Sequence, residues 1–356
     1  MDGEIQSFIK IWITAITCLC YCYHIVSRIP KGFFRLLFLL PIFYLFTILP
    51  LTLSSIHLIG VTFFFLVWLA NFKLLLFSFD HGPLSSPFPS NTIHFIFIAS
   101  LPINIKQTPP DEKPVKPNAS RLSKLILLGI KVILIAMILR AYDYRDKLHP
   151  YLILALYLCH IYLDVEIVLA ICAAPARAIF GFELEPQFNE PYLSTSLQDF
   201  WGRRWNVMVT TILRPTVYNP IRQIARRFVG TRWSKLPAVI ATFTVSGLMH
   251  EMLYYYPTRA PPTGEVLWFF ILHGVSVAVE VEVKKALLPR GWRLHRAVSG
   301  PLALLFLAVT GNWLFLPQLL RNGVDMKAIN EYAIMKEFVK ANLCNCMSML
   351  GLKIGA

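Results

Sequence analysis

Residues 56–77 read IHLIGVTFFFLVWLANFKLLLF, an almost unbroken block of apolar side chains. A helix rises 1.5 Å per residue, so about 20 such residues cross the hydrocarbon core of a bilayer. The apolar residues run continuously and do not recur at the period of a half-buried helix or strand. The block therefore predicts a membrane-spanning helix.

Seven further blocks of similar character give about eight spans in all. They cover residues 8–26, 34–53, 122–139, 151–174, 237–256, 267–283 and 298–317. A shorter apolar stretch, residues 93–105, is too short to cross, so we expect it to be re-entrant or interfacial. The sequence predicts an all-α integral membrane protein with one polytopic domain over residues 1–356.

The composition excludes a water-soluble fold. Hydrophobic residues make up 56% of the 356-residue chain and charged residues only 15%, whereas a soluble domain has roughly 25% charged residues. The formal net charge is +14, but Lys and Arg lie between the apolar blocks. Membrane topology and anionic lipid or substrate groups explain them better than nucleic acid does. The seven Cys lack the spacing of a metal site, and we expect no bound metal.

Four clusters of basic residues fall on one side of the predicted membrane. They occupy residues 28–35, 106–124, 177–235 and 284–296. The positive-inside rule places them in the cytosol and both termini in the lumen, although the basic segment 140–147 falls on the lumenal side. We expect the long cytosolic stretch, about residues 177–236, to be amphipathic.

One titratable side chain lies deep inside a predicted span. The stretch AVIATFTVSGLMHE, residues 238–251, places His250 about 20 Å along the helix from Pro237. A neutral imidazole can accept a proton near neutral pH, whereas a carboxylate there would be protonated and a lysine badly desolvated. His250 is therefore a candidate general base, and a structural hydrogen bond to a neighbouring helix is the alternative.

A second unusual region reads EPQFNEPYLSTSLQDFWGRRWN, residues 185–206. It combines aromatic, amide and paired arginine side chains and precedes a basic amphipathic segment. Arginine donates two hydrogen bonds at once to a phosphate, and aromatic faces can stack on a purine. The region therefore suits a phosphorylated headgroup, and an interfacial helix anchored by Trp and Arg is the alternative.

Four blocks of the chain together resemble the membrane-bound O-acyltransferase family, and more closely its plant wax synthase branch. They are SLQDFWGRRWN (196–206), SGLMHE (246–251), ANFKLLLF (70–77) and WLFLP (313–317). The similarity runs over most of the chain. It implies an enzyme of the endoplasmic reticulum membrane that transfers a fatty acyl group from acyl-CoA to a long-chain fatty alcohol and forms a wax ester.

The resemblance also implies roles for individual residues. His250 matches the catalytic histidine of the family, and Asn206 matches its second polar residue at the catalytic site. We expect five other residues of the block around Asn206 to bind acyl-CoA. They are Asp199, Trp201, Arg203, Arg204 and Trp205. No cofactor is expected beyond acyl-CoA as co-substrate, because a thioester is already activated.

The chemistry of the two substrates predicts a tunnel enclosed by the helices. Acyl-CoA has a soluble anionic end that would lie at the cytosolic mouth, and the alcohol would enter from the bilayer between helices. His250 would remove the hydroxyl proton as the oxygen attacks the thioester carbonyl, an effect worth about 10²–10⁴-fold. Asn206 would hold the carbonyl oxygen or the developing oxyanion.

Other ionisable residues inside the spans are expected to pair or to line the tunnel. They are His160, Asp164, Glu166, Glu280 and Glu282. Lys73 is expected to snorkel to the interface or to pair with one of these carboxylates.

Two alternatives for the function stay open. The acceptor could be a sterol or a diacylglycerol, because one architecture can serve several hydroxyl lipids. From another class, a transporter could relay protons through His160, Asp164, His250 and Glu280. A transporter would favour internal repeats, and the sequence contains none that we detect. The sequence predicts no oligomeric state.

Overall fold

A computed structural model describes residues 2–85, 88–102, 117–180, 185–291 and 294–349. These residues form helices and turns and contain no strand. Within them, eight helical segments are long and apolar enough to cross a membrane, at residues 3–28, 33–52, 56–78, 125–142, 150–176, 235–258, 265–287 and 296–321. Each overlaps one predicted span, which confirms the all-α membrane fold and the number of spans.

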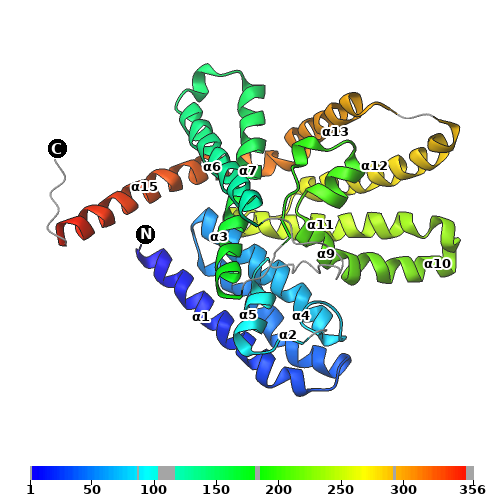
Figure 1. Ribbon diagram of the computed structural model, residues 1–356, viewed down its shortest axis with the longest axis horizontal. Coiled ribbons are helices and arrows are strands. Elements are labelled where there is room, and N and C mark those ends of the chain that lie inside the picture. The colour runs from blue at the N-terminus through cyan, green and yellow to red at the C-terminus, as the bar shows by residue number, and fades with distance from the viewer. Residues whose placement is uncertain (1, 86–87, 103–116, 181–184, 292–293, 350–356) are drawn as a thin grey trace.

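The N-terminal part of the chain forms three spans and a short helix (Figure 1). Its elements are α1 Asp2–His24, η1 Val26–Arg28, α2 Phe33–Ile48, η2 Leu49–Thr52, α3 Ile56–Thr62, η3 Phe63–Ala70, α4 Asn71–Ser78 and α5 Thr92–Ser100. The third span consists of α3, η3 and α4 in line. Segment η3 is a π-helix, and all but one of its residues are buried, so the third span lies at the centre of the bundle.

The apolar stretch 93–105 forms α5 in its described part, and residues 103–105 lie outside the described residues. Helix α5 contacts α1 and η3, so it lies within the protein. Lys73 is fully buried beside its end, and its Nζ donates to the carbonyl oxygens of Ile98 (2.6 Å) and Leu101 (2.7 Å). The expectation that Lys73 snorkels or pairs with a carboxylate is therefore wrong. Its charge satisfies the last carbonyls of a helix, which have no helical N–H partner.

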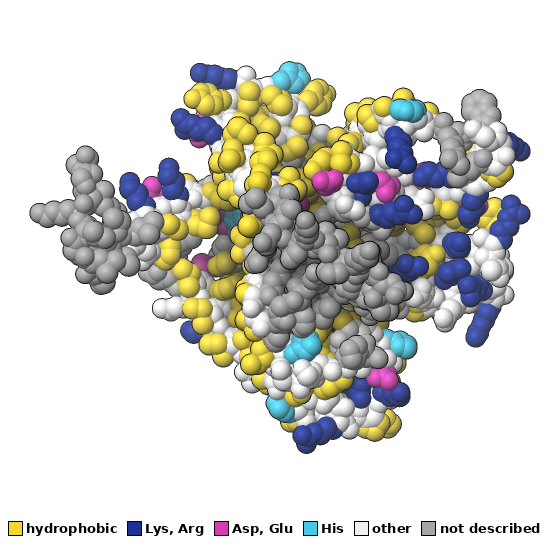
Figure 2. Space-filling model, in the orientation of Figure 1, with side chains coloured by type: hydrophobic (Ala, Val, Ile, Leu, Met, Phe, Trp, Pro, Cys, Tyr) yellow, Lys and Arg dark blue, Asp and Glu magenta, His cyan; other side chains and the backbone are white. Residues whose placement is uncertain are grey.

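The middle of the chain begins with an antiparallel pair, α6 and α7, at one edge of the molecule (Figure 1). Its elements are α6 Pro117–Tyr142, η4 Arg145–Lys147, α7 Pro150–Phe180, η5 Pro191–Leu193, α8 Leu197–Asp199, η6 Phe200–Arg204, α9 Val207–Leu213, η7 Arg214–Tyr218 and α10 Asn219–Trp233. Hydrophobic side chains are exposed over α6 and α7 (Figure 2), as expected for helices that face lipid.

Residues 177–236 do not form the single amphipathic stretch that the sequence predicts. Residues 177–180 complete α7, and residues 181–184 lie outside the described residues. The short elements from α8 to η7 pack against the bundle, and Phe200 of η6 and Met208 and Ile212 of α9 are buried there. Only α10 is a basic amphipathic helix with an exposed face.

The C-terminal part supplies the remaining three spans. Its elements are α11 Lys235–Thr258, α12 Glu265–Leu287, η8 Leu288–Arg290, α13 Arg296–Thr310, η9 Gly311–Phe315, α14 Pro317–Arg321 and α15 Val324–Met349. Helices α10, α11 and α12 run side by side, and α15 contacts α3 and α14 before it projects from the body (Figure 1). Lys and Arg side chains gather where α10 and the turn after α12 lie (Figure 2).

Candidate active site

A cavity of about 780 Å³ runs along α11 through the bundle. Residues from both ends of α11, Lys235 and Pro257, line it. Because a helix of 24 residues is about 36 Å long, the cavity follows α11 over a long distance. Its walls come from several spans and are mostly apolar and aromatic, which suits an alkyl chain.

The described chain has four π-helical segments, and each contributes to the cavity wall. Segment η3 supplies Trp68, η6 supplies Trp201, η7 supplies Arg214 and η9 supplies Phe315. A π-helical turn departs from the regular hydrogen-bond pattern and is frequent at functional sites. The spans and the loop segment therefore leave regular helical geometry at the positions where they face the cavity.

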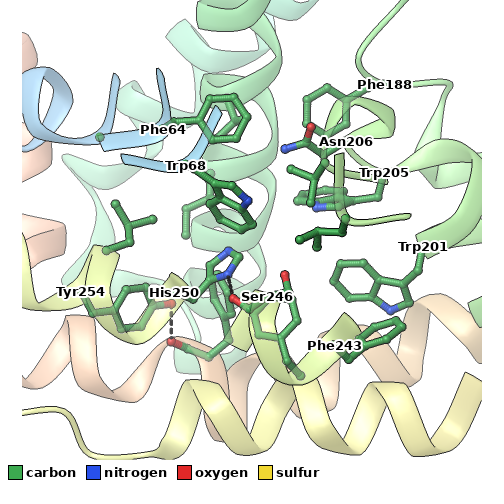
Figure 3. Close-up of a pocket in the computed structure, with 18 of the residues that line it drawn as sticks. Phe64, Trp68, Phe188, Trp201, Trp205, Asn206, Phe243, Ser246, His250 and Tyr254 are labelled. Carbon is green, nitrogen blue, oxygen red and sulfur yellow. Dashed lines mark hydrogen bonds between the residues drawn. The ribbon is translucent and has the colours of Figure 1, made fainter. Parts of the chain in front are cut away.

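His250 lies on α11 and faces the cavity. Its Nδ1 is 2.8 Å from the carbonyl oxygen of Ser246, one turn earlier in the helix. A carbonyl oxygen can only accept, so Nδ1 of the neutral ring bears the proton and Nε2 keeps its lone pair. In Figure 3 this second nitrogen points away from Ser246, toward the side of the cavity where Trp68 lies. The imidazole is therefore held in the tautomer that leaves Nε2 free to accept a proton.

Aromatic rings from three other segments surround the imidazole. The ring centroid of His250 lies 4.3 Å from that of Phe270, 5.2 Å from that of Trp68 and 5.9 Å from that of Phe315. These contacts limit the rotation of the ring. A base whose orientation is fixed before the substrate binds loses little entropy in the reaction.

Asn206 lies across the cavity from His250 (Figure 3). It precedes α9 with φ 38° and ψ 64°, a left-handed conformation that Asn adopts more readily than most residues. Its Oδ1 is buried without a hydrogen-bond partner among the described residues. Figure 3 shows its amide nitrogen directed toward the side of the cavity where Trp68 lies. The amide can therefore donate to a bound substrate.

Trp201 lines the cavity and is oriented by a buried chain of hydrogen bonds. Its Nε1 donates to Nδ1 of His273 at 3.1 Å, and Nε2 of His273 is 2.9 Å from Oγ1 of Thr310. An indole N–H only donates, so Nδ1 accepts and the neutral ring of His273 donates from Nε2. His273 is fully buried and does not line the cavity, so it acts on the site through Trp201.

Trp205 also lines the cavity and is held by stacking. Its ring lies 5.3 Å from Phe200, with the planes 19° apart, and meets Phe188 at 5.1 Å. These contacts place the indole beside Asn206 at the wall opposite His250 (Figure 3). Trp201 and Trp205 therefore both contribute to the site, as aromatic wall.

Arg204 and Asp199 pair with each other outside the cavity wall. Nε of Arg204 donates to Oδ2 of Asp199 at 2.8 Å, and Nη1 donates to the carbonyl oxygens of Asn189 and Glu190 at 3.2 Å each. Partial burial acts to raise the pKa of Asp199, but hydrogen bonds from Arg204 and from the Thr195 amide outweigh it and lower that pKa. The pair fastens the loop that presents Asn206.

Among the described residues, two exposed cations line the cavity, Arg214 and Lys235. Arg214 lies just before the start of α10, and Lys235 lies just after its end. Arg203 is exposed and does not line the cavity. Sequence reasoning missed Arg214 and Lys235 because they are two of many basic residues between 177 and 235. The side that each one faces depends on η7 and the start of α11.

The opposite end of the cavity holds a network of histidines and carboxylates. Nδ1 of His57 is 2.7 Å from Glu331, and Nε2 is 3.5 Å from Asp164. Tyr332 donates to Asp164 and lies 3.2 Å from His160. Burial acts to raise the pKa of Glu331, but hydrogen bonds from His57 and the chain around it lower that pKa to about 2. The network fastens α15 to α3 and α7.

The remaining predicted carboxylates are paired, as expected. Glu166 pairs with Lys131, Glu280 with Lys284 at 2.5 Å and Glu282 with Lys285 at 2.5 Å. The hydrogen bonds that the described chain makes at these groups do not lead to His250. Among the described residues, direct side-chain hydrogen bonds therefore do not connect the four groups of the transporter alternative.

Comparisons with known proteins agree on one family. Residues 184–272, which include Asn206 and His250, match the "Membrane bound O-acyl transferase family". A long-chain-alcohol O-fatty-acyltransferase of Simmondsia chinensis is 49% identical, with 99% of each chain covered. A probable long-chain-alcohol O-fatty-acyltransferase 1 of Arabidopsis thaliana is 46% identical over 96% of this chain and 98% of that protein. An acyl-CoA–sterol O-acyltransferase 1 of Arabidopsis thaliana is 46% identical over 93% of this chain and 96% of that protein.

Proposed function

The chain belongs to the membrane-bound O-acyl transferase family, and on this premise we propose that it transfers a fatty acyl group from acyl-CoA to a long-chain fatty alcohol, forming a wax ester. We place this reaction in the endoplasmic reticulum membrane. The observation that supports the proposal best is the arrangement of His250 and Asn206 on opposite walls of one apolar cavity.

The proposed step starts at Nε2 of His250, whose lone pair faces the cavity. This nitrogen takes the proton of the alcohol as the alcohol oxygen bonds to the thioester carbon. The carbonyl oxygen becomes negative and accepts a hydrogen bond from the Asn206 amide. When the carbonyl re-forms, the carbon–sulfur bond breaks, and the proton on His250 passes to the CoA sulfur. The step leaves His250 neutral, so the buried site need not hold a lasting charge.

A sterol is the second candidate acceptor. The relative named as a sterol acyltransferase is as similar to this chain, at 46% identity, as one of the fatty-alcohol relatives. A fatty alcohol is preferred because the relative with 49% identity over 99% of the chain is named for that acceptor. A flexible alkyl chain also fits the long apolar cavity that several spans line.

Expression in a host that lacks neutral-lipid acyltransferases tests the proposal. Cells that make this chain and receive fatty alcohol should accumulate wax esters, whereas cells that receive sterol should accumulate little steryl ester. If steryl esters accumulate and wax esters do not, the acceptor is a sterol. If neither ester accumulates, the proposed acyltransferase reaction is wrong.

The first prediction concerns the base. His250→Ala should lower the rate of ester formation about 100-fold or more, because general-base catalysis is worth about 10²–10⁴-fold. His81→Ala is the matched control, since His81 is exposed on a loop and does not line the cavity. If the His250 variant accumulates normally in membranes and keeps more than about a tenth of the rate, His250 is not the base.

A further inference from the structure

The strongest unexplained feature of the catalytic cavity is the indole of Trp68. The side chain is 3% exposed, and its Nε1 has no hydrogen-bond partner among the described residues. Burying a donor without an acceptor is costly, so such groups are rare in folded proteins. Trp68 also lines the cavity, in the π-helical segment η3 at the centre of the bundle.

Trp68 differs from another buried tryptophan, Trp12, in its position relative to the cavity. Nε1 of Trp12 is likewise buried without a partner in the described chain, but Trp12 does not line the cavity. An unpaired indole N–H is therefore not sufficient by itself to indicate a role. Trp68 meets the His250 ring nearly at a right angle, at 89°. In Figure 3 its nitrogen lies on the edge that faces across the cavity toward Asn206 and Trp205.

Three uncharged groups thus meet around one space. His250 presents the lone pair of Nε2, Asn206 presents its amide, and Trp68 presents an indole N–H. An acyl carbonyl in this space would have a base on one side and two donors on the others. Uncharged donors suit this position, because a permanent charge deep in the membrane would be strongly destabilised.

We propose that Nε1 of Trp68 donates a hydrogen bond to the thioester carbonyl oxygen as it becomes an oxyanion, so that Trp68 and Asn206 together form the oxyanion hole. This inference rests on the proposed acyl transfer. The alcohol proton moves to Nε2 of His250, the new carbon–oxygen bond forms, and the negative carbonyl oxygen is held by the two N–H groups. The carbon–sulfur bond then breaks, and the CoA sulfur takes the proton from His250.

Trp68→Phe tests the proposal, because it removes the N–H and keeps an aromatic ring against His250. We expect kcat to fall about 100-fold, the usual effect of one oxyanion donor. KM for acyl-CoA and for alcohol should change less than about threefold, because a donor used mainly in the transition state contributes little to ground-state binding. Trp12→Phe is the matched control and should keep the wild-type rate.

A second replacement guards against a packing defect in Trp68→Phe. Benzothienylalanine at position 68 has the shape of Trp with sulfur in place of N–H, and it should show the same loss of kcat. If either replacement accumulates in membranes and keeps more than about a third of the wild-type kcat, the role of the N–H is refuted. If the wild-type chain makes ester but Trp68→Phe raises only KM, Trp68 forms part of the cavity wall and does not donate a hydrogen bond to the oxyanion. If the wild-type chain makes no ester from any acceptor, the proposed function itself fails.

Discussion

The side chains that meet at the proposed reaction centre bear no fixed charge. His250, Asn206 and Trp68 are uncharged polar groups, while the cations Arg214 and Lys235 line the cavity just before and just after α10. Removing an ion from water costs several kcal/mol even after the protein relaxes around it. A site deep in a bilayer therefore works best with groups that can give or take a proton and return to neutrality within one turnover.

The two hydrogen bonds of His273 can be removed one at a time, by replacing His273 with Asn or with Gln. The amide oxygen of Asn can stand where Nδ1 accepts from Trp201, whereas the longer Gln reaches toward Nε2 and Thr310. We expect His273→Gln to lower kcat about tenfold, since a lost hydrogen bond of about 1–1.5 kcal/mol corresponds to that factor. His273→Asn should lose less than about threefold on the same scale.

The control for His273 uses a chain that has no N–H at position 201. In a Trp201→Phe background, His273→Gln and His273→Asn should have equal kcat. A difference that persists in that background would mean that His273 acts on the site by some route other than Trp201.

Helix α11 holds His250, and its position depends on close packing against α12. A Cβ added at Gly274 would lie 2.8 Å from Cβ of Phe243, and one added at Gly247 would lie 3.1 Å from the backbone Cα of Leu267. Small residues let membrane helices approach closely and gain van der Waals contact. The two glycines therefore set the distance between α11, which carries His250, and α12, which carries Phe270 and His273.

Gly274→Ala should consequently destabilise the protein by about 1–3 kcal/mol, the usual cost of overpacking. The melting temperature of the purified protein in detergent would fall, and kcat would fall with it, because α11 would move away from α12. Gly129→Ala is the matched control, since a Cβ there meets nothing within 4 Å. Equal melting temperatures for the two variants would show that α11 and α12 can separate without cost.

The existence of the spans could be predicted from the sequence, and their internal irregularities could not. Apolar blocks identify a span because the bilayer demands an apolar length of about 20 residues. The π-helical segment η3 lies inside such a block. Hydropathy depends only on which residues are apolar, so it does not indicate where the helical hydrogen-bond pattern changes. For the same reason hydropathy did not indicate a role for Trp68. Its position could have done so, because Trp is enriched at the membrane interfaces and Trp68 lies in the middle of a span.

At the scale of the whole molecule, the cavity has two chemically different ends. Lys235 lines the end at the start of α11, Arg214 lines the wall just before α10, and His57, Asp164 and Asp325 line the other end. The sequence identified His250 and Asn206 as a pair because a known family shares their order and spacing. It gave no means to tell that Arg204 bonds to Asp199 and two backbone carbonyls, since that contact depends on how the loop folds.

The asymmetry of the cavity predicts which end receives acyl-CoA. The CoA headgroup has several negative charges and the alcohol has none, so replacing Arg214 and Lys235 together by Gln should act on one substrate only. We expect KM for acyl-CoA to rise about tenfold, as for a lost charge-assisted contact, while KM for alcohol stays within about twofold. Added salt should weaken acyl-CoA binding to the wild type more than to the variant, because exposed charges are screened.

The Arg203→Gln variant tests whether the acyl-CoA headgroup binds at Arg214 and Lys235 or at the block around Arg203 that the sequence indicates. Arg203 is exposed in the same part of the chain but stands off the cavity wall, so its loss should leave both KM values near wild type. A rise in KM for acyl-CoA in Arg203→Gln, with none in the double variant, would move the headgroup to the outer face of η6. The acyl chain would then have to reach His250 past Trp201 and Trp205 instead of along α11 from Lys235.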